Sequence, residues 1–193
     1  TGSVNEDGTL TVSNSSNATS VTGVSQDTGS PYSLSAGTAR SVAFNHDGTK
    51  MFVVHAPGTA TISEHALTTA FDINTASQST TYDISSHISE PRGIRFNSDG
   101  TKLYIATGAS YGTGNPNLVT YNLSTAWDIT TASFVSQSNV SAEDSAMKSI
   151  DFNSDGSKVF LLGDTNDKVF QYSLSTAYDA STDSYDSVSV AVA

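Results

Sequence analysis

The residues that could do chemistry in this sequence are carboxylates, imidazoles and hydroxyls, because it contains no cysteine. Its densest carboxylate group is the run Asp164-Thr165-Asn166-Asp167. Hard cations such as Ca²⁺ prefer clustered carboxylate and carbonyl oxygens, but this run lacks the spaced ligands and closing glutamate of an EF-hand. Asp164, Asn166 and Asp167 therefore form either a calcium site or a solvated turn, and no other cofactor is expected.

The four histidines share no recurring spacing to a carboxylate and form no H-E-x-x-H motif. His55 and His65 would flank a loop between two strands, where a transition metal is the alternative to an ordinary loop position. A Ser-His-Asp site can also assemble from distant residues, so sequence spacing alone does not exclude one. No residue stands out as catalytic, and we expect a protein that is not an enzyme.

Six of the eight basic residues occur at repeated positions, which indicates a structural role. Three precede an apolar stretch and three follow a turn: Arg40, Arg92 and Lys148, then Lys50, Lys102 and Lys158. We expect them to neutralise nearby carboxylates, each exposed pair contributing only about 0 to 1 kcal/mol.

These basic residues belong to one phrase that is written three times. It reads RSVAFNHDGTKMFVV from Arg40, RGIRFNSDGTKLYIA from Arg92 and KSIDFNSDGSKVFLL from Lys148. A second phrase follows each copy: ALTTAFDI from Ala66, NLSTAWDI from Asn122 and SLSTAYDA from Ser173. Two phrases in a fixed order indicate a structural repeat of about 50 residues, a period typical of solenoids, propellers and arrays.

Each repeat predicts four short antiparallel strands. An Asp-Gly pair between apolar runs marks a tight turn, because glycine adopts positive φ without a Cβ penalty. The third strand ends at Leu67, Leu123 or Leu174, and the fourth covers about residues 79–84, 134–140 or 187–192. The recurring structural residues are Phe44, Asp47, Gly48, Phe96, Asp99, Gly100, Phe152, Asp155, Gly156, Phe71, Trp127 and Tyr178. The aromatic members are expected to pack between neighbouring sheets.

The pattern F-N-x-D-G-[TS]-K with its apolar run resembles the repeats of bacterial translocation-type and lactonase-type propellers. The phrase L-S-T-A-[FWY]-D resembles tandem blades of large bacterial and phage surface proteins. The resemblance implies an all-β, β-propeller-like array of four-stranded antiparallel blades, at about residues 37–88, 89–144 and 145–193. These families include scaffolds, adhesins and a few enzymes, so fold alone does not give the activity.

Residues 1–36 form a separate β segment. The string VNEDGTLTVS from Val4 echoes the repeat turn and also resembles VCBS-type and cadherin-like adhesin repeats. The segment is therefore either a degenerate fourth blade or a joining or exchange strand. Closed propellers have about four to eight blades. Three blades leave two end sheets uncovered, so we expect self-association or neighbouring domains of a longer chain.

Composition limits the partners. The chain has 193 residues and a formal charge of -11, which disfavours nucleic acid and anionic lipid as partners. No stretch reaches the roughly 18 apolar residues of a membrane helix, so we expect no membrane insertion. Its 33 Ser and 25 Thr are typical of secreted or surface-displayed proteins, on a cell or a virion. We expect a non-enzymatic, extracellular structural or adhesive module within a surface, filament or virion-tail assembly. The alternatives are a calcium-assisted glycan-binding propeller and a propeller hydrolase. Tyr111 lies at the tip of a glycine-rich loop, which is predicted to be a contact loop.

Overall fold

The computed structural model describes residues 2–4, 10–12, 38–56, 58–108 and 117–192. The chain forms two compact units, Thr1–Pro31 and Tyr32–Ala193. The first contains the antiparallel pair β1 (Gly2–Val4) and β2 (Leu10–Val12). No helix among the described residues is long and apolar enough to span a membrane.

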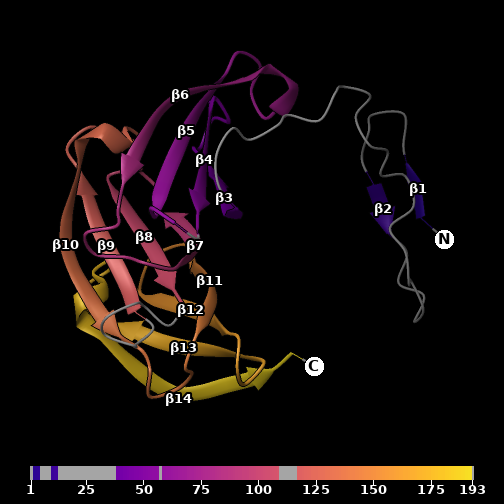
Figure 1. Cartoon of the computed structure of the whole chain (residues 1–193). Helices are drawn as coiled ribbons and strands as arrows, with labels where there is room; N and C mark the ends of the chain where they lie inside the picture. Colours follow the sequence, from indigo (N-terminus) through magenta and orange to yellow (C-terminus); the bar gives the residue numbers. More distant parts are fainter. Residues whose placement is uncertain (1, 5–9, 13–37, 57, 109–116, 193) are drawn as a thin grey trace. The chain divides into compact units, whose positions relative to one another are not determined.

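The second unit consists of three four-stranded antiparallel sheets (Figure 1). The first sheet is β3 (Ala39–Phe44), β4 (Lys50–His55), β5 (Thr61–Leu67) and β6 (Ala76–Asp83). The second is β7 (Pro91–Phe96), β8 (Lys102–Thr107), β9 (Asn117–Leu123) and β10 (Ala132–Asn139). The third is β11 (Met147–Phe152), β12 (Lys158–Gly163), β13 (Lys168–Leu174) and β14 (Asp183–Ala191). The prediction of an all-β fold with four-stranded antiparallel sheets is confirmed.

The only helices in the described residues are three short 3-10 turns: η1 (Ile73–Thr75), η2 (Ile129–Thr131) and η3 (Ala180–Thr182). Each begins after an aspartate, Asp72, Asp128 or Asp179, whose carboxylate accepts a bond from a backbone amide two residues on. Each turn leads directly into the fourth strand of its sheet, the outer strand (β6, β10 or β14). The outer strands therefore start earlier than the sequence predicted.

The Asn-x-Asp-Gly turns join the first two strands of every sheet. In the first turn the Asp47 carboxylate accepts bonds from the Thr49 amide at 3.0 Å and the Thr49 hydroxyl at 2.6 Å. Asn45 Oδ1 accepts from the Lys50 amide at 2.8 Å, and Gly48 has φ of 72°. The amide bond recurs at Asp99 and Asp155 and the hydroxyl bond at Asp99, so the repeated letters specify one turn three times.

An aromatic residue closes each turn from outside. Phe71, Trp127 and Tyr178 have φ values of 59°, 60° and 57°, and their amides donate to the carbonyls of Gly48, Gly100 and Gly156. Non-glycine residues rarely adopt this backbone conformation, which costs free energy. The packing of each ring against the glycine of its turn offsets that cost.

The sheets pack face to face, with β7 between β3 and β11. One core joins the first and second sheets and includes Phe52, Ile62, Leu103 and Tyr121. A second core joins the second and third sheets and includes Tyr104, Leu118, Leu161 and Tyr172. Rings meet across both junctions, Phe52 with Phe96 at 4.6 Å and Tyr104 with Phe152 at 4.5 Å between centroids. The arrangement is propeller-like, and the described sheets do not close into a ring.

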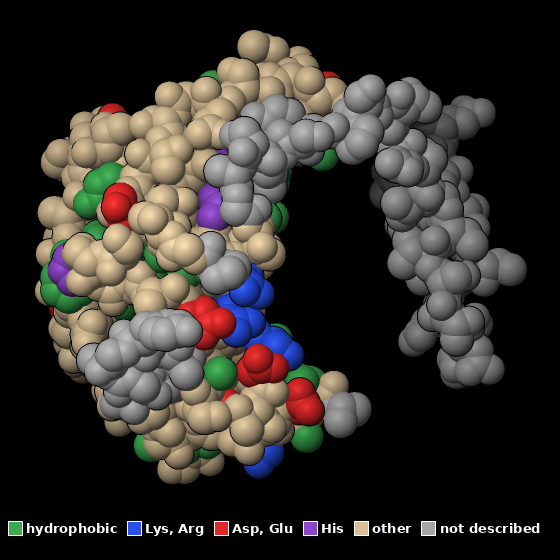
Figure 2. All heavy atoms as spheres, in the orientation of Figure 1, with side chains coloured by type: hydrophobic (Ala, Val, Ile, Leu, Met, Phe, Trp, Pro, Cys, Tyr) green, Lys and Arg blue, Asp and Glu red, His purple; other side chains and the backbone are tan. Residues whose placement is uncertain are grey.

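A basic residue lies near the start of the first strand of each sheet, here called the inner strand (β3, β7 and β11). The register between the first two strands shifts at one residue in every sheet, and that residue is Arg40, Arg92 or Lys148. A bulge of this kind redirects the side chain that it carries. Arg92 pairs with Glu90 at 2.5 Å and Lys148 with Asp164 at 2.5 Å. Basic and acidic side chains lie next to one another along the inner edge in Figure 2.

Candidate functional site: a pocket at the turn end of the inner strands

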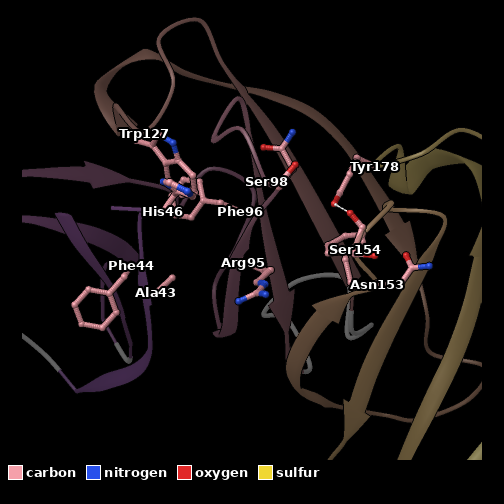
Figure 3. A pocket seen from close by; sticks show the side chains of 12 residues that line it. Ala43, Phe44, His46, Arg95, Phe96, Ser98, Trp127, Asn153, Ser154 and Tyr178 are labelled. Carbon is pink, nitrogen blue, oxygen red and sulfur yellow. Dashed lines mark hydrogen bonds between the residues drawn. The ribbon is translucent and has the colours of Figure 1, made fainter. Parts of the chain in front are cut away.

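A pocket of about 390 Å³ lies where β3, β7 and β11 end in their turns (Figure 3). Its apolar wall consists of the repeated aromatics and one small residue, and its polar wall comes from the inner strands and turns. The lining residues are Ala43, Phe44, Phe96, Phe152, Trp127, Tyr178, His46, Arg95, Asn97, Ser98, Asn153 and Ser154. Its size and its mixture of aromatic and polar side chains are typical of small-molecule sites.

Arg95 supplies the positive charge of the pocket. Its Nε lies 3.0 Å from Asp151 Oδ1, and the two side chains are 51% and 62% exposed. The pair joins the second sheet to the third, since Arg95 lies on β7 and Asp151 on β11. The guanidinium has five N–H donors, so this contact leaves donors for a ligand.

His46 comes from the first turn, so the pocket combines groups from three sheets. Its imidazole is exposed. The bond from the Thr49 side chain is the largest cause that lowers the pKa of the adjacent Asp47 carboxylate, and His46 contributes least. In one aromatic-walled hollow the imidazole can take up and release a proton, and the guanidinium can stabilise a developing negative charge.

Several polar lining groups are already engaged. Asn97 Oδ1 accepts from the Lys102 amide at 2.9 Å, and Asn153 Oδ1 accepts from the Lys158 amide at 2.9 Å. The Tyr178 hydroxyl donates to the Ser154 carbonyl at 3.0 Å. These residues shape the pocket, whereas His46 and Arg95 are the lining side chains that could take part in a reaction.

The sequence did not predict this pocket. The repeated aromatic residues are predicted only to pack between neighbouring sheets, and no histidine is predicted to be catalytic. A usable signal exists in the repeat, because Ala43, Arg95 and Asp151 occupy the same position in the three copies. That position lies between an aliphatic residue and an invariant phenylalanine, and it varies from neutral to basic to acidic.

The predicted calcium ligands lie between β12 and β13. Asp164 pairs with Lys148, and the Asn166 side-chain amide donates to the Glu143 carbonyl at 2.8 Å. Asp167 has φ of 48°. No group of three or more His, Asp or Glu side chains within the described ranges could hold a metal. Calcium binding here stays a prediction, and the contact loop with Tyr111 lies outside the described residues.

Two histidines and a serine form a buried polar row on the first sheet. Ser63 Oγ lies 2.7 Å from His55 Nε2 and 2.9 Å from His65 Nε2. Burial lowers the pKa of both histidines. Ser63 is only 3% exposed. A substrate therefore has little access to its hydroxyl, and we assign the row no catalytic step.

The chain also contains two short strings with the order of hydrolase motifs. Gly108-Ala-Ser-Tyr-Gly112 follows G-x-S-x-G, but its serine lies outside the described residues. Ser145-Ala-Met-Lys148 follows S-x-x-K, and there the serine hydroxyl bonds Thr165 Oγ1 at 2.6 Å while the lysine pairs with Asp164. The second string therefore does not form a Ser-Lys pair.

Solved structures show what this fold resembles. The Pseudomonas aeruginosa periplasmic gluconolactonase aligns with a TM-score of 0.53 and 18% identity, over 79% of this chain and 39% of that chain. A candidate 6-phosphogluconolactonase from Bacteroides fragilis aligns with a TM-score of 0.56 and 12% identity, over 80% and 39%. A Desulfotomaculum acetoxidans protein of unknown function aligns at 0.54 and 11%, over 83% and 43%. This chain thus spans about two fifths of each.

No known family model matches the sequence, and no curated protein matches it either. The structural comparison corrects the expectation of a non-enzymatic structural or adhesive module. Among the solved structures that share this fold are proteins named for lactonase activity, and this finding contradicts the prediction that the protein is not an enzyme. The repeated letters predict the sheets and most of the pocket wall, whereas His46 and Arg95 stand at positions that differ between the copies.

Proposed function

We propose that the three sheets are blades of a propeller-type hydrolase that opens the cyclic ester of a sugar acid in the pocket. The observation that carries the proposal is the placement of His46 and Arg95, from two different sheets, in one aromatic-walled hollow. The fold shared with proteins named gluconolactonase supports the choice of a lactone.

The aromatic wall suits a sugar ring. Phe96 and Trp127 lie with their ring centroids 4.9 Å apart, and Phe152 and Tyr178 lie 5.6 Å apart. Such rings offer apolar faces for the C–H side of a sugar, while Ser98 and Ser154 lie close by in the turns. Arg95 would also attract the carboxylate or phosphate of an acidic sugar.

The proposed reaction needs only water and the lactone. Water attacks the carbonyl carbon while the neutral imidazole of His46 takes one of its protons. The carbonyl electron pair moves to the oxygen, to which Arg95 donates hydrogen bonds. Collapse of this tetrahedral species restores the carbonyl and breaks the ring C–O bond, and the leaving alkoxide takes the proton from His46. The product is the open hydroxy acid.

The test is hydrolysis of gluconolactone and of its 6-phosphate, measured as acid release above the spontaneous rate. His46→Gln should reduce the enzymatic rate on the order of 10²-fold or more, the usual contribution of a general base. Arg95→Gln should reduce it as well, with the greater loss on the phosphorylated lactone.

Matched controls separate chemistry from folding. His87→Gln removes a histidine that stacks on Phe134 at 3.9 Å, away from the pocket residues, and Lys168→Gln removes an exposed positive charge on β13. Both should keep the parent rate. A parent protein that does no better than buffer on either lactone would reject the proposal, as would equal losses in the control variants.

A further inference from the structure

The two end sheets of the second unit each present an apolar face that neither of the other two four-stranded sheets covers. The first-sheet face contains Val42, Met51, Val53, Leu67 and Ile73, and includes a hollow of about 360 Å³. Val42 is 53% exposed and Ile73 46% exposed, whereas Met51, Val53 and Leu67 beneath them are 3 to 6% exposed. Burying such side chains is favourable by roughly 25 cal/mol per Å². An exposed patch of this kind marks an interaction site.

The equivalent residues of the second and third sheets indicate what packs on this face. Val42 corresponds to Ile94 in the second sheet and Ile150 in the third, and both of these are 5% exposed. Ile73 corresponds to Ile129, 0% exposed, and Ala180, 1% exposed. In the second and third sheets these residues are covered by the preceding sheet. The first-sheet face therefore has the form of a surface that accepts a preceding sheet.

The third sheet carries the opposite surface. The face that each sheet offers to the next contains Phe52, Val54 and Ile62 in the first sheet, all 0% exposed. The second sheet offers Tyr104, Ala106 and Leu118, at most 1% exposed. The corresponding third-sheet face consists of Phe160, Leu162, Val169, Val188 and Val190. Here Val190 is 63% exposed and Val188 47% exposed.

A hydrogen bond that recurs between neighbouring sheets indicates the same packing order of the sheets. Lys50 Nζ donates to the Trp127 carbonyl at 2.8 Å, and Lys102 Nζ donates to the Tyr178 carbonyl at 2.9 Å. Each bond runs from one sheet to the carbonyl of the aromatic residue in the next. Lys158 and Phe71 are the remaining lysine and carbonyl of this series, at the two opposite ends of the stack. Lys158 uses its ammonium for Asp186 and Ser173, which leaves one of its three N–H donors.

We propose that the third-sheet face of one copy packs on the first-sheet face of a second copy, and that two copies close head to tail into one ring. Both faces are apolar and unpartnered by the described sheets, and each matches the surface that the other would meet at the internal junctions. Two copies supply six blades, inside the range of about four to eight in closed propellers, whereas one supplies too few and three supply nine. A head-to-tail contact that closes is a normal route to a symmetric pair.

The test is the mass of the full chain in solution, by light scattering and sedimentation. The parent protein is expected at twice the 20.1 kDa chain mass. Val42→Asp and Val190→Asp should each give a monomer, because every contact of the ring joins one first-sheet face to one third-sheet face. Mixing the two variants should restore a pair of weaker affinity, because one contact then has two parent faces.

The control is Val135→Asp, which places the same charge at a 46% exposed valine on the outer strand of the middle sheet. It should remain a pair, and circular dichroism should show the same β spectrum for all three variants. A monomeric parent protein overturns the proposal, as does a pair that survives Val190→Asp or a mixture that stays monomeric. An open filament overturns the closed ring.

Discussion

The indole of Trp127 lies over Gly100 so closely that a Cβ built on the glycine would be 2.2 Å from the ring. Gly100 also has φ of 72°, which favours glycine. Gly100→Ala should therefore destabilise the protein by about 2 to 4 kcal/mol, since it adds a steric clash to left-handed strain. Urea unfolding followed by Trp127 fluorescence measures this, because the chain has a single tryptophan.

The matched control is Gly58→Ala. Gly58 has φ of 107°, but a Cβ there would meet nothing within 4 Å. The Gly58→Ala variant carries backbone strain without a clash against a ring. Its loss in the free energy of unfolding should therefore be smaller than that of Gly100→Ala. Equal costs for the two variants would show that the aromatic cover contributes nothing to the requirement for glycine.

Lys50 is expected to matter more than its equivalent in the second sheet. Its Nζ lies 2.8 Å from Glu64 Oε1, and the Glu64 side chain is only 7% exposed. Lys50→Met would leave a buried carboxylate without its cation and should cost about 2 to 3 kcal/mol. Denaturant midpoints at neutral pH measure the loss.

Lys102→Met is the internal comparison. Lys102 makes the same bond to the next sheet, but Thr120 occupies the position of Glu64. Its loss should cost about 1 kcal/mol, the value of one hydrogen bond. If both variants lost the same amount, Glu64 would not depend on Lys50.

The sequence predicted those parts of the fold that are repeated. The Asn-x-Asp-Gly turn has few alternative conformations, and three copies of it fixed the inner hairpins. The outer strands were placed too late, because the 3-10 turn after Asp72 and its equivalents has no apolar periodicity. The buried row of His55, Ser63 and His65 was not predicted, because its hydrogen bonds depend on strand register rather than on sequence spacing. The pocket depends on where three turns meet, which no single repeat encodes.

The buried histidines make stability sensitive to mild acid. Burial is the main cause that lowers the pKa of His55 and His65, and Glu64 opposes the shift at His65. The unfolded state therefore binds protons more readily than the folded state below about pH 6.5, the ordinary histidine pKa. The stability that the folded state gains from neutral His55 and His65 is present above that pH and declines as the pH falls below it.

The double variant Ser63→Val/His65→Tyr tests this pH dependence, because it copies the second sheet, where Val119 and Tyr121 occupy these positions. The parent should lose stability between pH 7.5 and 5.5 in urea titrations, and the variant should lose less. The carboxylates are unchanged between the two proteins, so the difference reports the histidines. Parallel losses would mean that the row does not titrate in this range.

Asp151 is expected to weaken the binding of anions in the pocket, since its carboxylate occupies one side of the Arg95 guanidinium. The pair is more than half exposed, so Asp151→Asn should change the free energy of unfolding by less than about 0.5 kcal/mol. Removing the competing charge should tighten the binding of gluconate, the ring-opened acid, several-fold by calorimetry. Salt should weaken that binding, because exposed charges are screened within about 10 Å at 0.1 M. Arg95→Gln should abolish it in both backgrounds, and gluconate affinity that Asp151→Asn leaves unchanged would place the anion elsewhere in the pocket.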